Sequence, residues 1–284
     1  MRLLERSGVA LLLGLRGGRG DRGGRGDPVS ATGLAVAAAH DSSASSLAAP
    51  ALEARGLVRE YGSVVAVAGI DLALQRGEFL TVFGPNGAGK SSLLGMLAGS
   101  LRPTRGEVLV NGATLDFGAV DLRRNIGVLS HEGFLYAQLT VEENLRFYGR
   151  LYGLRDLDRR VPERLSHVRL AERASSLVGQ LSHGMRQRLA LARALLHDPD
   201  VVLLDEPYTG LDPSAAAILR GVLTELRDGH RSVVMVTHNL SEGLALASRV
   251  AVQVRGRFAW QGKGDEVDTS DFERLYHRVV EGGS

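Results

Sequence analysis

The 284-residue sequence contains no cysteine, no apolar run as long as a membrane span, and almost no net charge. The missing cysteines exclude disulfide bonds and thiolate metal sites, and they fit a reducing compartment. A helix needs about 20 apolar residues to cross a bilayer, so any membrane role is expected to depend on a partner. With 34 basic against 32 acidic side chains, the formal charge of +2 provides no general attraction for nucleic acid or anionic lipid.

The first fifty residues differ in composition from the rest. They are rich in Gly, Arg, Ala and Ser without periodicity, and we expect residues 1–50 to be a disordered low-complexity extension. This segment has six arginines against four acidic residues, so the rest of the chain is neutral. Contact with RNA through its RGG-like part, a short signal-like stretch at VALLLGL, a dispensable extension and a mis-assigned start are the alternatives.

From residue 51 onward, strands and helices alternate in a way that predicts a largely parallel sheet covered by helices. Between the apolar strand EFLTVFG and the helix KSSLLGMLAGSL, the segment from Gly84 to Ser91 fits the phosphate-loop pattern G-x-x-x-x-G-K-[ST]. Lys90 is expected to neutralise the outer phosphates, and the Ser91 hydroxyl to ligate magnesium. The predicted nucleotide-binding residues here are Gly84, Pro85, Asn86, Gly87, Ala88, Gly89, Lys90, Ser91 and Ser92.

Two adjacent carboxylates follow a second apolar strand, Val201 to Leu204. Open α/β sheets place their ligands at the carboxyl ends of the strands, where Asp205 and Glu206 would emerge. We expect Asp205 to hold magnesium through water. Glu206 is expected to polarise or deprotonate the water that attacks the γ-phosphate.

The segment LSHGMRQRLALARALL, residues 181–196, has a serine and a glycine near its start, Ser182 and Gly184, and continues as a strong helix former. Unpaired N–H groups and the helix dipole make such a start an anion site. The segment lies about ninety residues beyond the phosphate loop, and spacing alone does not say which anion it takes.

In order and content, these motifs resemble the nucleotide-binding subunit of an ABC transporter over about residues 51–280. GPNGAGKS resembles its Walker A loop, LLDEP its Walker B strand, LSHGM its LSGGQ signature and GLD its D-loop. The resemblance implies an α/β P-loop NTPase with a mixed sheet core, an antiparallel β subdomain and a helical subdomain at about residues 131–190, within an ATP-binding domain spanning 51–284. It also implies that Tyr61 stacks on adenine and that His238 is a catalytic switch residue beside Glu206 and Lys90.

The same resemblance answers the question raised by the signature helix. In this family, the signature contacts the γ-phosphate held by a second subunit, so ATP and Mg²⁺ would be buried between two head-to-tail copies. The signature and D-loop residues implied to contact nucleotide are Ser182, Gly184, Met185 and Asp212. His183 replaces a glycine and Met185 a glutamine of the family pattern, whereas Gly184 is kept.

The position of the family's magnesium-binding glutamine is filled by His131. Imidazole is a poor ligand for this hard cation, so we expect His131 to act through water or not at all. A histidine here, followed by LTVEENLRFYGRLYGL, is similar to the ATP-binding subunit of the haem exporter of cytochrome c maturation. After His238, the chain has room for a hairpin at 249–262 and a terminal helix near 271–281.

The resemblance therefore implies an ATPase that energises a separate integral membrane permease from the cytoplasmic face of the inner membrane as a peripheral homodimer, without a nucleic-acid partner. We expect an exporter, with haem as the leading cargo. A drug, lipid or polysaccharide exporter, a soluble ATPase acting on ribosomes or nucleic acid, and a regulatory module without turnover are the alternatives. Aromatic residues of the helical subdomain are expected either in its core or in a groove for the permease: Tyr136, Phe147, Tyr148 and Tyr152.

Overall fold

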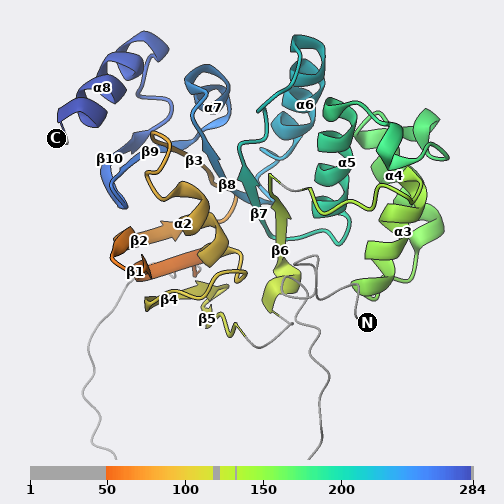
Figure 1. The fold of residues 1–284 in the computed structure, drawn as a ribbon, viewed down its shortest axis with the longest axis horizontal. Helices are drawn as coiled ribbons and strands as arrows, with labels where there is room; N and C mark the ends of the chain where they lie inside the picture. The colour runs from red at the N-terminus through yellow and green to blue at the C-terminus, as the bar shows by residue number, and fades with distance from the viewer. Residues whose placement is uncertain (1–48, 118–121, 132, 283–284) are drawn as a thin grey trace, which may run out of the picture.

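The computed structural model describes residues 49–117, 122–131 and 133–282 (Figure 1). The expectation about residues 1–50 therefore falls almost entirely outside the described residues. Within them, every helix is too short or too polar to cross a bilayer.

A six-stranded sheet forms the core of the molecule. Five neighbouring strands are parallel, and β10 is an antiparallel edge strand. In spatial order, the strands are β10 (Arg257–Lys263), β9 (Arg249–Val254), β3 (Phe79–Phe83), β8 (Ser232–Thr237), β7 (Val201–Asp205) and β6 (Ile126–Leu129). The central strands β3, β8 and β7 are apolar and almost entirely buried, as parallel strands covered on both faces should be.

Helices cover both faces of this sheet. Successive side chains of a strand point to opposite faces. Val202 and Leu204 of β7 pack in one core with α5 (His183–Leu195), whereas Val201 and Leu203 pack in another with α2 (Lys90–Leu97). The two helices therefore lie on opposite faces of the sheet.

A second, four-stranded antiparallel sheet lies beside α2 (Figure 1). Its spatial order is β2 (Val64–Leu74), β1 (Leu52–Tyr61), β4 (Arg105–Val110) and β5 (Ala113–Thr114). The apolar face of β1 and β2 packs on the same core as α2. This contact fixes the phosphate-loop helix between the two sheets.

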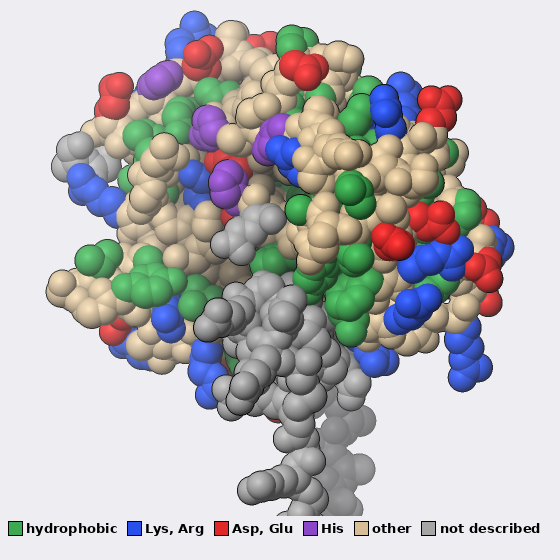
Figure 2. All heavy atoms as spheres, turned by 45° about the vertical axis from the view of Figure 1, so that its right-hand side comes forward, with side chains coloured by type: hydrophobic (Ala, Val, Ile, Leu, Met, Phe, Trp, Pro, Cys, Tyr) green, Lys and Arg blue, Asp and Glu red, His purple; other side chains and the backbone are tan. Residues whose placement is uncertain are grey.

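A group of helices lies to one side of the six-stranded sheet (Figure 1). It comprises α3 (Val141–Leu151), α4 (Leu157–His167), the short turns η2 (Ala171–Arg173) and η3 (Val178–Gln180), and α5. Helix α3 begins at a capping box, in which the side chains of Thr140 and Glu143 each accept a hydrogen bond from the other's backbone N–H. Charged side chains of both signs are interspersed over this side of the molecule (Figure 2).

The four aromatic residues of this group belong mainly to its core. Tyr148 is 1% exposed, and its hydroxyl donates a hydrogen bond to the Phe134 carbonyl. Tyr136, Phe147 and Tyr152 are partly buried and pack against the same core. Packing therefore accounts for most of the surface of these rings.

The remaining elements are η1 (Leu122–Asn125), α6 (Pro213–Glu225), α7 (Leu240–Leu246) and α8 (Thr269–Gly282). The hairpin and terminal helix predicted after His238 are present as β9, β10 and α8. Strand β9 also pairs with β3, so the hairpin belongs to the central sheet. Helix α8 is anchored by Phe272, which is fully buried. The centroid of its ring lies 5.1 Å from that of the Phe83 ring. The mixed sheet, the antiparallel sheet and the helical group confirm the predicted fold class.

Candidate nucleotide-binding site

The phosphate loop joins β3 to α2 and approaches other backbone so closely that only glycine fits at two positions. A Cβ on Gly84 would lie 2.2 Å from the Gln253 carbonyl oxygen, and one on Gly89 would lie 2.0 Å from that of Ala66. Gly89 has a φ of 97° and precedes α2 without a side-chain cap. The first N–H groups of α2 are therefore left for a ligand, as phosphate binding requires.

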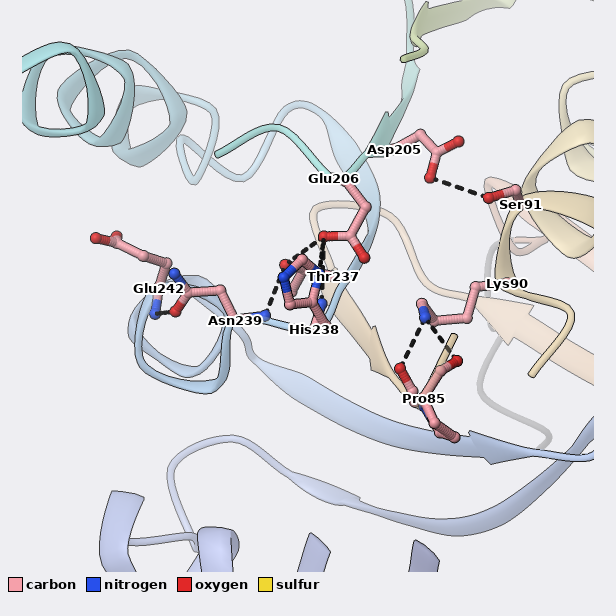
Figure 3. Close-up of polar contacts among 10 residues, drawn as sticks. Pro85, Lys90, Ser91, Asp205, Glu206, Thr237, His238, Asn239 and Glu242 are labelled. Carbon is pink, nitrogen blue, oxygen red and sulfur yellow. Dashed lines mark hydrogen bonds and ion pairs between the residues drawn. The ribbon is translucent and has the colours of Figure 1, made fainter. Parts of the chain in front are cut away.

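Lys90 is the first residue of α2 and is 7% exposed. Its ammonium group donates to the carbonyl oxygens of Gly84 and Pro85 at 2.7 and 3.1 Å (Figure 3). Burial lowers the pKa of Lys90, against the opposing effect of the charges on Glu206 and Asp205. The buried ammonium group already donates to carbonyl oxygens of its own loop, so it is well placed to donate to phosphate oxygens in their place when nucleotide binds.

Asp205 ends β7 and faces Ser91 across the site. The Ser91 hydroxyl lies 3.4 Å from the Asp205 carboxylate (Figure 3). Burial, followed by the neighbouring charge of Glu206, raises the pKa of Asp205. A hydroxyl and a carboxylate are the hard oxygen donors that Mg²⁺ takes together with phosphate, so these two residues fit the metal.

We expect Asp205→Asn to raise the free energy of unfolding of the nucleotide-free protein at pH 7 while abolishing Mg²⁺-dependent ATP hydrolysis. The pKa of this carboxyl is raised in the folded state, so the free energy of unfolding falls as the pH rises from the ordinary pKa of 3.8 through the folded-state pKa. That loss of stability is still present at pH 7. The amide removes the penalty and also the metal ligand. Calorimetry without nucleotide measures the first effect, with the exposed Asp265→Asn as control. A lower unfolding temperature for Asp205→Asn would contradict this prediction.

Glu206 follows Asp205 with a φ of 47°, a left-handed conformation that costs a non-glycine residue energy. This turn brings its Oε2 within reach of three donors at the end of β8 and directly after it: the Thr237 hydroxyl at 3.1 Å, the His238 backbone N–H at 3.3 Å and the His238 Nδ1 at 2.9 Å (Figure 3). Within the described residues, Oε1 has no hydrogen-bond partner, so this oxygen can accept a proton from water.

His238 is held by the same carboxylate. A carboxylate only accepts, so Nδ1 of His238 must be the donor, which leaves Nε2 as the other hydrogen-bonding atom of the ring. The ring is more than half exposed. The predicted catalytic residues Lys90, Glu206 and His238 therefore lie in one site with Ser91 and Asp205.

Tyr61 lies at the end of β1, next to the phosphate loop. Its hydroxyl is 3.4 Å from the Ser92 hydroxyl, and Arg59 lies over its ring at 4.5 Å. Tyr61, Val64 and Val65 are the exposed large apolar side chains around this hairpin. An exposed ring next to the phosphate loop is suited to stacking on a base.

The signature residues lie at the start of α5, on the other face of the sheet from α2. Ser182 is the N-cap, and its hydroxyl accepts from the Met185 N–H at 3.2 Å. Gly184 packs against α6, where an added Cβ would lie 2.6 Å from the Cβ of Ala215. The structure therefore does not bring Ser182, Gly184 and Met185 together with the phosphate loop of the same chain.

His183, which departs from the family pattern, contacts the loop before α6. Its Nε2 lies 3.0 Å from the Thr209 carbonyl oxygen, and a Cβ on Gly210 would lie 3.3 Å from the same nitrogen. Asp212 ends this loop as the N-cap of α6, where its carboxylate accepts from the Ala215 N–H at 2.9 Å. The signature and the D-loop are thus joined within one chain.

His131 follows β6 and is exposed. The positive charge that it can carry lowers the pKa of Asp205, which places it beside the metal-ligand candidates. Its role, through water or otherwise, stays a prediction.

Sequence reasoning missed two residues that shape the site. Thr237 donates to Glu206, and buried Gln253 on β9 donates from Nε2 to the Ala88 carbonyl at 3.0 Å. The signal for Gln253 was a polar residue within the apolar strand RVAVQV; Thr237 directly precedes the histidine that had been singled out.

Comparisons with known proteins agree with this geometry. A family model described as ABC transporter matches residues 67–209. Nod factor export ATP-binding protein I of Ralstonia nicotianae is 37% identical over 224 residues, which cover 78% of this chain and 70% of that protein. The spermidine/putrescine import ATP-binding protein PotA of Pseudomonas aeruginosa is 38% identical over 73% of this chain and 58% of that protein.

Solved structures agree as well. An ATP binding subunit of an ABC transporter matches with a TM-score of 0.73 and 30% identity over 80% of this chain and 98% of that one. The dimeric ATP-binding cassette MJ0796, bound to ADP and Pi, matches with a TM-score of 0.68 and 27% identity over 75% of this chain and 98% of that one. The chain therefore belongs to the ABC transporter family as an ATP-binding subunit that binds ATP with Mg²⁺ and hydrolyses it to drive transport.

Proposed function

We propose that two copies of this chain close head to tail around ATP, with the phosphate loop of one copy facing the signature of the other. The observation that carries this proposal is the placement of α2 and α5 on opposite faces of one sheet. Two anion-binding helix starts that are separated in this way are not able to surround one triphosphate within a single chain. A second copy supplies the missing half of each site.

In the closed pair, each nucleotide would contact residues from both copies. Lys90 and the N–H groups at the start of α2 would hold the phosphates, and Ser91 with Asp205 would hold Mg²⁺. Ser182 and the N–H groups at the start of the partner's α5 would face the γ-phosphate. The free Oε1 of Glu206 would take a proton from the attacking water while His238 keeps the carboxylate in place.

The dimer would act on a separate membrane permease from the cytoplasmic face of the membrane, as an exporter. The name of the Nod factor relative, which is an export ATP-binding protein, supports this direction. PotA, at similar identity, is named as an import protein, so the direction rests on the export-named relatives and on the compact helical group. The mixed charge over that group supports a protein partner rather than nucleic acid (Figure 2).

Haem remains a narrower hypothesis for the cargo. It rests on His131 and the segment LTVEENLRFYGRLYGL that follows the loop, whereas the relatives above are named for other cargoes. Apart from this resemblance to the haem exporter subunit, the nucleotide site would suit any permease whose transport is driven by dimer closure.

Co-purification from membranes tests the proposal. An affinity-tagged Glu206→Gln chain, solubilised with MgATP, is expected to retain an integral membrane protein identified by mass spectrometry, and Lys90→Ala to retain much less. If the retained partner is RNA or a ribosomal protein, the transport assignment is wrong. Spectroscopic detection of haem bound to the captured permease would select the haem hypothesis, and its absence would favour a drug, lipid or polysaccharide cargo.

A further inference from the structure

A pocket of about 360 Å³ lies between α4 and the connection from α5 to β7, away from the nucleotide site. It is lined by Arg159, Arg160, Glu163, Arg164, His167, Leu196 and Asp198. Five of the seven lining residues belong to α4, and Leu196 provides a buried apolar wall. Three of the seven lining residues are arginines.

The arginines around this pocket are only partly neutralised. Arg159 pairs with Glu163 at 2.9 Å, and the neighbouring Arg231 pairs with Asp198 and with Asp228. Arg160 and Arg164, by contrast, form no side-chain hydrogen bond or ion pair with any residue that the structure describes. The acidic side chains beside the pocket are therefore already engaged, and two guanidinium groups are left over.

The environment of Arg164 makes its lack of a partner costly. Burial lowers the pKa of Arg164, and the like charges of Arg231 and Arg160 lower it further, against the opposing charges of Asp198 and Glu163. Arg164 is partly buried, and a guanidinium that loses part of its hydration without a hydrogen-bonded counter-ion is not compensated for that loss. A bound anion would supply the missing partner and relieve the repulsion among the arginines.

His167 provides a further donor at the same place. Its Nδ1 lies 3.2 Å from the Glu225 carboxylate, which only accepts, so Nδ1 is the donor. Its Nε2 is buried and has no partner among the described residues. Burial lowers the pKa of His167. An anion in the pocket would favour the imidazolium, whose Nε2–H can donate to it.

The pocket is separate from the ATP site because it lies at the opposite end of the sheet. Asp198 precedes β7 and Arg231 precedes β8, whereas Asp205 ends β7 and Glu206 and His238 directly follow the carboxyl ends of these strands. A five-residue strand spans about 15 Å at ~3.3 Å per residue. One nucleotide is therefore unable to fill both places.

We propose that Arg160, Arg164 and His167 form a second anion site that takes a phosphate group. Arginine recognises phosphate through parallel N–H bonds, and a volume of 360 Å³ accommodates a phosphate with a small organic substituent. The phosphate belongs either to a soluble phosphorylated compound or to a lipid headgroup. This site does not depend on the head-to-tail dimer.

Isothermal titration of the whole chain with pyrophosphate tests the site, with the ATP site kept saturated by MgADP. Arg164→Gln is expected to weaken pyrophosphate binding at least about tenfold, as loss of a charge-assisted bond predicts. Arg173→Gln, which removes an exposed arginine of the same helical group, should bind as the original chain does. NMR of ring-labelled histidine should show the pKa of His167 rising when pyrophosphate is added, and His167→Gln would assign the signal.

Flotation with vesicles containing phosphatidic acid distinguishes the two sources. Arg164-dependent binding of pyrophosphate supports a soluble phosphorylated ligand, and Arg164-dependent binding of vesicles without pyrophosphate binding supports a lipid headgroup. If neither probe binds, or if Arg164→Gln binds both as well as Arg173→Gln does, the proposal is wrong. Thermal melts of each variant show whether a loss of binding comes from unfolding instead.

Discussion

Glu206→Gln is expected to lower kcat for ATP hydrolysis at least about 100-fold while leaving the affinity for MgATP within about twofold, as removal of a general base predicts. The carboxamide oxygen can replace Oε2 and accept from Thr237 and from both donors of His238. The NH₂ group then takes the place of the free Oε1 and is unable to accept a proton. The substitution thus keeps the hydrogen bonds that position the side chain and removes the oxygen that accepts a proton from the attacking water.

Turnover and nucleotide binding are measured separately for this variant, by phosphate release and by equilibrium binding. Glu172→Gln, an exposed glutamate on η2, serves as the matched control and should turn over normally. With MgATP, Glu206→Gln should also elute as a dimer in size-exclusion chromatography. Near-normal hydrolysis in Glu206→Gln would refute the assignment of the base, whereas a monomer under these conditions would refute the closed pair.

Gly89→Ala is expected to weaken ATP binding at least about 100-fold, a change of about 2.7 kcal/mol, whereas Gly87→Ala in the same loop should change it little. A methyl group on Gly89 would lie 2.0 Å from a carbonyl oxygen of β2 and 3.0 Å from the amide nitrogen of Gln253, so the loop would have to move. A methyl group on Gly87 meets nothing within 4 Å.

Both glycines have positive φ, 97° and 81°, so both alanines carry the left-handed penalty of about 1–2 kcal/mol. Chemical denaturation would measure this shared loss in the free energy of unfolding. Any additional loss in Gly89→Ala would measure the cost of the steric clash with β2. Nucleotide affinity measured well below the unfolding transition then isolates the change in loop position. Equal affinities for the two variants would mean that the close approach of β2 does not shape the phosphate loop.

The sequence predicted those parts of the site that a short segment determines. Gly84 to Ser91 form a strand-to-helix loop, and Asp205 and Glu206 directly follow a buried strand, so local rules placed them at one edge of the sheet. The apolar runs of β3 and β7 likewise predicted buried parallel strands.

Contacts between distant segments were not predictable in this way. The three donors to Glu206 come from the end of another strand, and Gln253 reaches the phosphate loop from a hairpin that had been predicted only as a hairpin. The contact between His183 and Thr209 depends on the packing of α5 beside α6. Each of these requires the tertiary arrangement, which hydrophobic period and motif spacing do not specify.

The packing contact between the start of α5 and the loop before α6 restricts which substitutions evolution can accept there. Because the His183 ring fits against Gly210 and Gly184 leaves room for Ala215, bulk at one of these positions is tolerated only if its counterpart stays small. Among homologues, a larger residue at 210 should therefore occur with a smaller residue at 183, and a larger residue at 184 with a smaller residue at 215.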